Sequence, residues 1–236
     1  MRKMGVIVVE TAGAPRCPDG APASKSGFAM VAAIAFALLP FSAPQVAAQD
    51  GQKPNIIEEK HGNITNYRVE GSLAPTQSVG CIPIAAAKSN MTPADLYPGV
   101  LICIDQSKYD MATALFALAG IYARFDAERI TDKTAGQAGQ VLIMNTFATL
   151  TQDRKTQFGA AFNRVTGSPQ SLGPLCAAIE KIGAPDYYPK YMILHGMKAF
   201  MDDPYKDALA AEFDKAATWR RLQSDYLRCP AAGEKH

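Results

Sequence analysis

Four residues towards the C-terminal end of the chain carry side chains suited to recognition or catalysis. They are Tyr187, Tyr188, Tyr191 and His195. Tyr191 and His195 are four residues apart, so a helix would place both on one face. Aromatic side chains with polar ends are over-represented at binding hot spots. We therefore take these four residues as the candidate binding surface. The alternative is that they pack in the core, with hydroxyls at its rim and His195 as a hydrogen-bonded structural histidine.

Motifs of common hydrolases are missing from the sequence after residue 48, which has no GxSxG, SxxK, HExxH or CxxC. Such motifs are the usual sequence signals of a serine nucleophile or a metal site. No catalytic residue, metal ligand or cofactor is therefore predicted. One alternative from the enzyme class is a small secreted hydrolase in which His195 acts with Asp186 or Asp202.

An export signal is predicted at the N-terminal end. Residues 28–41 form an apolar run that contains the helix breaker Pro40, and small residues follow up to Ala48. This pattern is typical of a secretory signal. The run is too short for a membrane-spanning helix, which needs about 20 residues. We predict a signal peptide with an extended n-region over residues 1–48, no integral membrane segment after its cleavage, and a periplasmic or secreted protein.

The cysteines that follow residue 48 favour two disulfides. An even number of cysteines in an exported chain is the usual sign of such bonds. Three pairings are possible, and we favour the one in which each disulfide closes a local loop. The pairs are Cys81 with Cys103 and Cys176 with Cys229.

The charge balance argues against two kinds of partner. Residues 1–48 hold four of the 24 basic and two of the 22 acidic residues, so the remainder of the chain is formally neutral. Nucleic-acid binders and proteins held electrostatically on membranes rely on an excess of basic groups. We therefore expect no nucleic-acid partner and predict that the partner is another protein.

The predicted fold is all-α. Residues 49–80 are polar and rich in turn residues, which indicates a flexible leader with one short strand near residues 66–71. Residues 81–230 show helical periodicity and few strand signals, and residues 231–236 are expected to be a disordered tail. We predict a disulfide-stapled domain of six or seven helices, arranged as a bundle or as an irregular array of helical hairpins.

Capping residues suggest where the helices begin and end. Thr92 with Pro93 after it favours one helix start, although Pro98 either kinks that helix or moves its start to about Tyr97. Thr131 or Thr134 is expected to cap a later helix. Further features are a cap at Thr151, a helix end near Gly167, a helix end at Gly183, a helix start at Asp186 and a closing helix over residues 206–229.

The run from Lys108 to Asp126 is predicted to contain the central helix, which we place from about Tyr109 to Arg124. Two apolar stripes flank a narrow small or polar band that contains Gly120, so the helix needs burial on more than one side. Gly120 would let a neighbouring helix come close. One stripe consists of Ala112, Leu115, Phe116, Ala119 and Tyr122, and the other of Met111, Ala114, Leu118, Ile121 and Phe125.

Part of this helix resembles a tetratricopeptide or Sel1-type repeat. From Lys108 to Ala119, the family's tyrosine, alanine, aromatic and alanine positions are matched by Tyr109, Ala112, Phe116 and Ala119. The resemblance implies a helical hairpin. The preceding residues depart from the pattern, and no second copy is visible at the expected period of about 34 residues.

These observations lead to one main functional hypothesis and two alternatives. The main hypothesis is an exported, non-enzymatic helical protein that binds another protein, such as a periplasmic immunity protein or inhibitor. The alternatives are the secreted hydrolase described above and a helical module that binds an apolar ligand in its Met- and Phe-rich interior.

Overall fold

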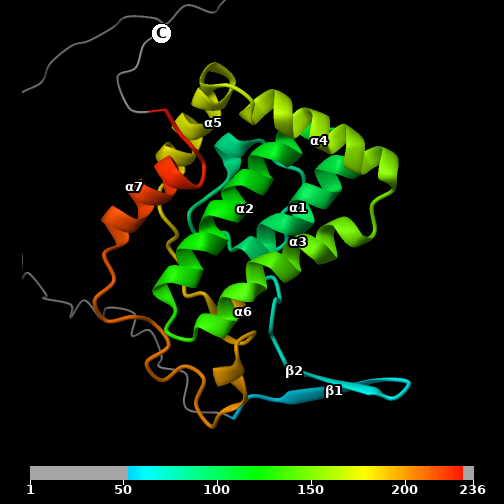
Figure 1. Ribbon diagram of the computed structural model, residues 1–236, viewed down its shortest axis with the longest axis vertical. Helices are drawn as coiled ribbons and strands as arrows, with labels where there is room; N and C mark the ends of the chain where they lie inside the picture. The colour runs from blue at the N-terminus through cyan, green and yellow to red at the C-terminus, as the bar shows by residue number, and fades with distance from the viewer. Residues whose placement is uncertain (1–52, 231–236) are drawn as a thin grey trace, which may run out of the picture. The chain divides into compact units, whose positions relative to one another are not determined.

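The computed structural model describes residues 53–230 of the chain (Figure 1). The predicted signal peptide and the predicted C-terminal tail lie outside these residues. The described part is mainly helical, with two disulfides and one small sheet, which confirms the predicted all-α class. Its α-helices are α1 (Pro93–Asp105), α2 (Tyr109–Arg129), α3 (Ala138–Ala148), α4 (Gln152–Thr166), α5 (Pro169–Ile182), α6 (Lys190–Ile193) and α7 (Lys215–Asp225). Its 3-10 helices are η1 (Ile84–Ala86), η2 (Lys133–Gln137) and η3 (Met197–Phe200).

Helix α2 is the centre of the fold, as predicted. It contacts α1, α3, α4 and α7, and Figure 1 shows it in the middle of the helical unit. Both predicted stripes are largely buried, because neighbours cover the helix on several sides. Phe116 is partly buried and meets Tyr97 and three phenylalanines at ring distances of 5.6–6.0 Å. The fully buried side chains include Ala112, Leu115, Leu118, Ala119, Ile121, Tyr122 and Phe125.

Helix α1 starts at Pro93, in agreement with the helix start predicted from Thr92 and Pro93. The Thr92 hydroxyl accepts a hydrogen bond from the Asp95 amide, and the Asp95 carboxylate accepts from the Thr92 amide at 2.8 Å. This reciprocal pair is a capping box, which satisfies two backbone donors that the start of the helix would otherwise leave unpaired. The helix continues through Pro98, so the alternative start near Tyr97 is wrong. Asp95 is fully buried and also accepts from the Gln77 amide at 2.9 Å.

The segment before the helices contains a β-hairpin. Strand β1 (Ile56–His61) pairs antiparallel with β2 (Ile64–Val69), with Ile56 opposite Val69. Strand β2 corresponds to the short strand that was expected near residues 66–71. Strand β1 was not expected, so the prediction that the rest of the leader has no regular structure is wrong. The two-residue turn between the strands contains Gly62, whose φ of +62° is easily reached only by glycine.

Three helices differ from the prediction in where they begin or end. Helix α3 is preceded by η2, which is capped by the Asp132 side chain and not by Thr131 or Thr134. Between Asp186 and α6 the chain has no helix, because Pro189 directly precedes α6. The closing helix is shorter than expected, since Asp214 caps it and it ends at Asp225. The Thr151 cap and the helix ends near Gly167 and at Gly183 agree with the prediction.

The close neighbour of Gly120 is a side chain, where a helix backbone was expected. A Cβ at this position would overlap the hydroxyl of Tyr226, which follows directly after α7. The Arg124 guanidinium lies over the Tyr226 ring at 5.3 Å from its centre. The missing side chain at Gly120 therefore makes room for Tyr226 against the surface of α2.

Candidate functional site

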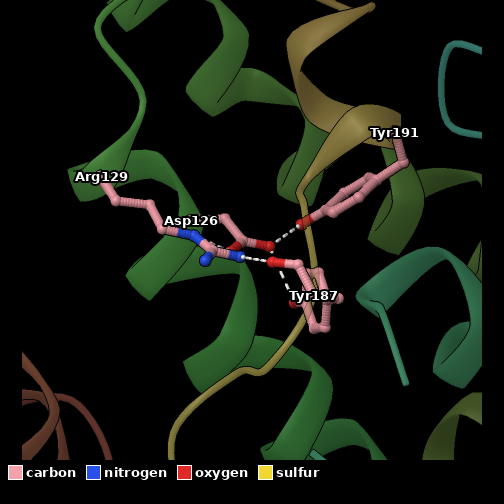
Figure 2. A network of polar contacts seen from close by, with 4 residues as sticks. All are labelled: Asp126, Arg129, Tyr187 and Tyr191. Carbon is pink, nitrogen blue, oxygen red and sulfur yellow. Dashed lines mark hydrogen bonds and ion pairs between the residues drawn. The ribbon is translucent and has the colours of Figure 1, made fainter. Parts of the chain in front are cut away.

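The structure brings two of the candidate tyrosines to a buried carboxylate. Asp126 lies near the C-terminal end of α2 and is fully buried. Its Oδ2 accepts hydrogen bonds from the Tyr187 and Tyr191 hydroxyls, both at 2.8 Å (Figure 2). Asp126 thus joins α2 to α6 and to the segment before it, more than 60 residues further along the chain.

Arg129 completes this network from the next turn of α2. Its Nε and one terminal nitrogen lie 2.9 and 2.7 Å from Oδ1 of Asp126. The same terminal nitrogen donates to the Tyr187 carbonyl at 2.9 Å. The guanidinium also lies over the Tyr187 and Phe125 rings, 5.2 and 5.4 Å from their centres. Both carboxylate oxygens are therefore bonded, as a buried charge requires.

Burial dominates the electrostatics of the network. It raises the pKa of Asp126 from 3.8 to about 6, while Arg129 and the two tyrosine hydroxyls act in the opposite direction. Burial also raises the pKa of Tyr187 and of Tyr191 well above the usual value, and the nearby Asp126 charge adds to that rise. Both hydroxyls are therefore protonated donors at neutral pH.

The other two candidate residues lie elsewhere. Tyr188 is exposed and its ring lies 6.2 Å from that of Tyr205. His195 is half-buried, and its Nδ1 lies 3.2 Å from the Ser72 hydroxyl. The four residues do not form one surface, because α6 ends at Ile193 and the expected shared helical face does not exist.

The contact between His195 and Ser72 lies in the seam that attaches the hairpin. Val69 is buried against Leu194 and Ala199, and the Leu73 amide donates to the Tyr191 carbonyl at 3.0 Å. Burial lowers the pKa of His195. These neighbours fit the structural role that was the alternative for this histidine.

Neither carboxylate proposed to act with His195 is paired with it. Asp202 forms an ion pair with Lys53 at 2.9 Å, and the Asp186 amide donates to the Ser89 carbonyl at 2.8 Å. Ser72, which does contact His195, was not singled out by its sequence context, since no nucleophile motif surrounds it.

Asp126 and Arg129 were also missed by sequence reasoning, because the predicted helix was taken to end at about Arg124. The sequence nevertheless contained a pattern that indicates a buried carboxylate at Asp126. Asp126 follows Tyr122 by four residues and Ala119 by seven, so it continues a buried stripe. A carboxylate on a buried stripe implies a buried partner, and Arg129 is the cation whose i,i+3 spacing places it on the same face of the helix.

Both predicted disulfides are present. Cys81 pairs with Cys103 and Cys176 pairs with Cys229, with S–S distances of 2.03 and 2.04 Å. They are the pairs favoured from the sequence. Disulfides persist in oxidising surroundings, so they fit a periplasmic or extracellular location. Within residues 53–230, no helix is long and apolar enough to span a membrane, and no cluster of three or more potential metal ligands is found.

An apolar cavity of about 300 Å³ lies beside α2, α4 and α5. It is the feature that suits the apolar-ligand alternative. Its walls include Phe116, Phe162, Leu172, Leu175, Leu227 and Tyr226.

A group of exposed apolar side chains lies around η3. Met197 and Met201 are 67% and 61% exposed, and Phe200 and Tyr188 are exposed as well. We call these four residues the 188–201 face. Ala199, between them in sequence, is fully buried and packs with the same small cluster as Tyr205, the residue whose ring meets Tyr188.

The fold and site define a small, disulfide-stapled helical domain with a buried polar centre and several exposed apolar side chains around η3. The chain matches no protein-family model, no curated protein and no solved structure. A functional proposal therefore depends on the chemistry of the described residues.

Proposed function

We propose that this protein is an exported, non-enzymatic protein that binds another protein through the 188–201 face. The observation that carries the proposal is the gathering of four large exposed apolar side chains in one short segment. Exposed apolar groups that cluster are typical of interaction sites, and interface cores are enriched in aromatic residues and methionine. An immunity protein or inhibitor in an oxidising compartment is the class of binder that fits best.

The backbone beneath this face is held in place by the rest of the fold. The Met197 amide donates to the Thr134 hydroxyl and the Lys198 amide donates to the Asp132 carboxylate, both at 2.8 Å. Such fixed positions favour binding, because less conformational freedom is lost when the partner docks.

The proposal is tested by affinity capture from a periplasmic extract of the source organism, followed by binding measurements with the captured partner. Met197→Lys with Met201→Lys places two charges on the face without touching the core. We expect this double variant to bind the partner at least tenfold more weakly, since charges are depleted from interface cores. Equal binding by the wild type and the double variant would contradict the proposed face.

The matched control is Met144→Lys. Met144 lies on α3 and is 53% exposed, so this substitution adds the same charge at a similar exposure away from the proposed face. Its binding is expected to equal that of the wild type. A loss as large as that of the double variant would show that added charge acts non-specifically.

The hydrolase remains the second candidate, because Ser72 and His195 lie 3.2 Å apart. Serine with histidine is the arrangement of an activated nucleophile. If the non-enzymatic proposal holds, a fluorophosphonate probe does not label the native protein. Labelling of the wild type that disappears in both Ser72→Ala and His195→Ala would favour the hydrolase and reject the binding-only proposal.

A further inference from the structure

Phe116 lies on the central helix α2, yet its side chain is not fully buried. Four aromatic rings surround it, with ring centres 5.6–6.0 Å away, and the side chain still keeps part of its surface accessible. The apolar cavity of about 300 Å³ beside α2, α4 and α5 has Phe116 in its wall, so the ring is accessible from this cavity. Protein interiors contain few voids larger than a water molecule, and an apolar hollow that reaches the centre of a fold is typical of a small-molecule site.

The walls of this cavity suit a hydrocarbon chain. Helices α2, α4 and α5 and the residues after α7 each contribute apolar side chains. These are Phe116, Ala117, Phe162, Leu172, Leu175 and Leu227. An engineered apolar cavity of about 150 Å³ holds one benzene molecule, so a cavity of twice that volume has room for about ten carbon atoms.

Arg228 is the charged residue in the wall. It is exposed, and within residues 53–230 its side chain forms no hydrogen bond or ion pair. Long basic side chains lay their carbon stem along apolar surface and keep the charge in water. An exposed arginine in the wall of an apolar cavity therefore marks the mouth of the cavity, where the charged end of a ligand would stay hydrated.

The backbone holds Arg228 at this position in an unfavourable conformation. Its φ is +60°, in the left-handed region that usually belongs to glycine after the end of a helix. The next residue is fixed, because the Cys229 amide donates to the Gln223 carbonyl at 2.9 Å and its sulfur is bonded to Cys176 on α5. Residues held in such conformations by their surroundings are common at ligand-binding positions.

We propose that this cavity binds a medium-chain fatty acid. The hydrocarbon chain lies against the apolar walls, and the carboxylate at the mouth pairs with the Arg228 guanidinium, whose planar fork matches the two carboxylate oxygens. This inference gives the apolar-ligand alternative a ligand class. It depends neither on the 188–201 face nor on a protein partner, so its failure and the failure of the proposed function are distinguishable.

The test uses octanoate as the probe, titrated by calorimetry into the full exported chain after extraction of any co-purified lipid. We expect one octanoate to bind saturably. 1-Octanol has the same chain but no charge, and it should bind at least tenfold more weakly. Butanoate keeps the charge but buries less of a chain, and it should bind about a hundredfold more weakly. Equal affinities for octanoate and either of the other compounds, or no binding of octanoate, would overturn the proposal.

The charge at the mouth is tested with two arginine variants. Arg228→Gln is expected to weaken octanoate binding about tenfold, because it removes the charge that pairs with the carboxylate. Arg220→Gln is the matched control and should leave the affinity unchanged, since Arg220 is an exposed arginine of α7 that also lacks an ion pair but lies outside this wall. Equal losses in the two variants would show that any surface arginine attracts the anion, which would reject the assigned role of Arg228.

The apolar part of the site is tested by filling it. Ala117 is buried on α2 in the cavity wall, and Ala117→Leu extends a side chain into the space that the ligand needs. We expect octanoate binding to fall at least tenfold, while the melting temperature of the ligand-free variant stays unchanged or rises, because filling a cavity adds apolar contacts. Unchanged octanoate binding would place the ligand elsewhere. A clearly lower melting temperature would show that no open space exists at Ala117, and either result would overturn the proposal.

Discussion

Replacing Asp126 by alanine is expected to lower the free energy of unfolding by about 3 to 5 kcal/mol, the usual effect of removing one partner of a buried ion pair. The variant leaves the nearly buried Arg129 guanidinium without a countercharge and the Tyr187 and Tyr191 hydroxyls without an acceptor. Urea unfolding followed by fluorescence measures the effect. Trp219, the single tryptophan, is buried beside Phe125 and reports on this region.

The matched control is Asp110→Ala on the same helix. Asp110 pairs with Arg164 on the surface, where both side chains are exposed. Exposed ion pairs contribute little, so we expect a loss below about 1 kcal/mol. Similar losses for the two alanine variants would show that burial does not distinguish Asp126 and that its network does not stabilise the fold.

The pH dependence of stability gives the same network a second readout. The pKa of Asp126 is raised from 3.8 to about 6, so between these values the folded state binds more protons than the unfolded state. The contribution of Asp126 is therefore largest below pH 4 and is lost as the pH rises to about 6. In Asp126→Asn this pH-dependent loss of stability should disappear. A difference in the free energy of unfolding between wild type and variant that stays constant from pH 4 to 7 would contradict the raised pKa of Asp126.

His195 is expected to make stability depend on pH in the opposite direction. Burial holds its pKa below the usual 6.5, so its contribution to stability grows as the pH rises towards that value. The two effects overlap near pH 6. The comparison of wild type with Asp126→Asn is consequently more informative than the pH profile of the wild type alone.

Replacing Cys176 and Cys229 by serine is expected to lower the free energy of unfolding by about 4 kcal/mol. The disulfide joins residues 53 positions apart, and its loss lets the unfolded chain gain the entropy of that loop. The same change at Cys81 and Cys103, 22 positions apart, is expected to cost about 3 kcal/mol. Urea unfolding of the oxidised proteins measures both losses.

Reduction of the wild type provides the control for the cysteine variants. With both disulfides reduced, its stability should approach that of a variant with all four cysteines replaced, and reductant should not affect that variant. A wild type whose unfolding midpoint is insensitive to reductant would show that the disulfides do not form in the native protein.

Local sequence signals predicted much of the fold. The burial of α2 followed from its two stripes, because residues three and four apart share a helix face whatever packs against it. The Thr92 and Thr151 caps were recognisable because capping is a contact between near neighbours in sequence. The local disulfide loops were predictable for a similar reason.

The candidate site depended on contacts that local patterns do not encode. Tyr187 and Tyr191 meet Asp126 across more than 60 residues, and an irregular segment with two prolines carries them there. The sequence marked these tyrosines as notable but did not distinguish the two that face inward from Tyr188, which faces outward. A cavity lined by Tyr97, Arg124 and Tyr226 likewise arises where α1, α2 and α3 meet, so no single segment could reveal it.

The two disulfides join cysteines that are consecutive in the sequence, first Cys81 with Cys103 and then Cys176 with Cys229. When a chain enters an oxidising compartment N-terminal end first, both cysteines of the first pair arrive before either cysteine of the second pair. An oxidase that links thiols in their order of arrival therefore forms the native pairs directly. Maturation of this protein should need thiol oxidation but no disulfide isomerase, which chains with interleaved pairs require to correct mispaired bonds.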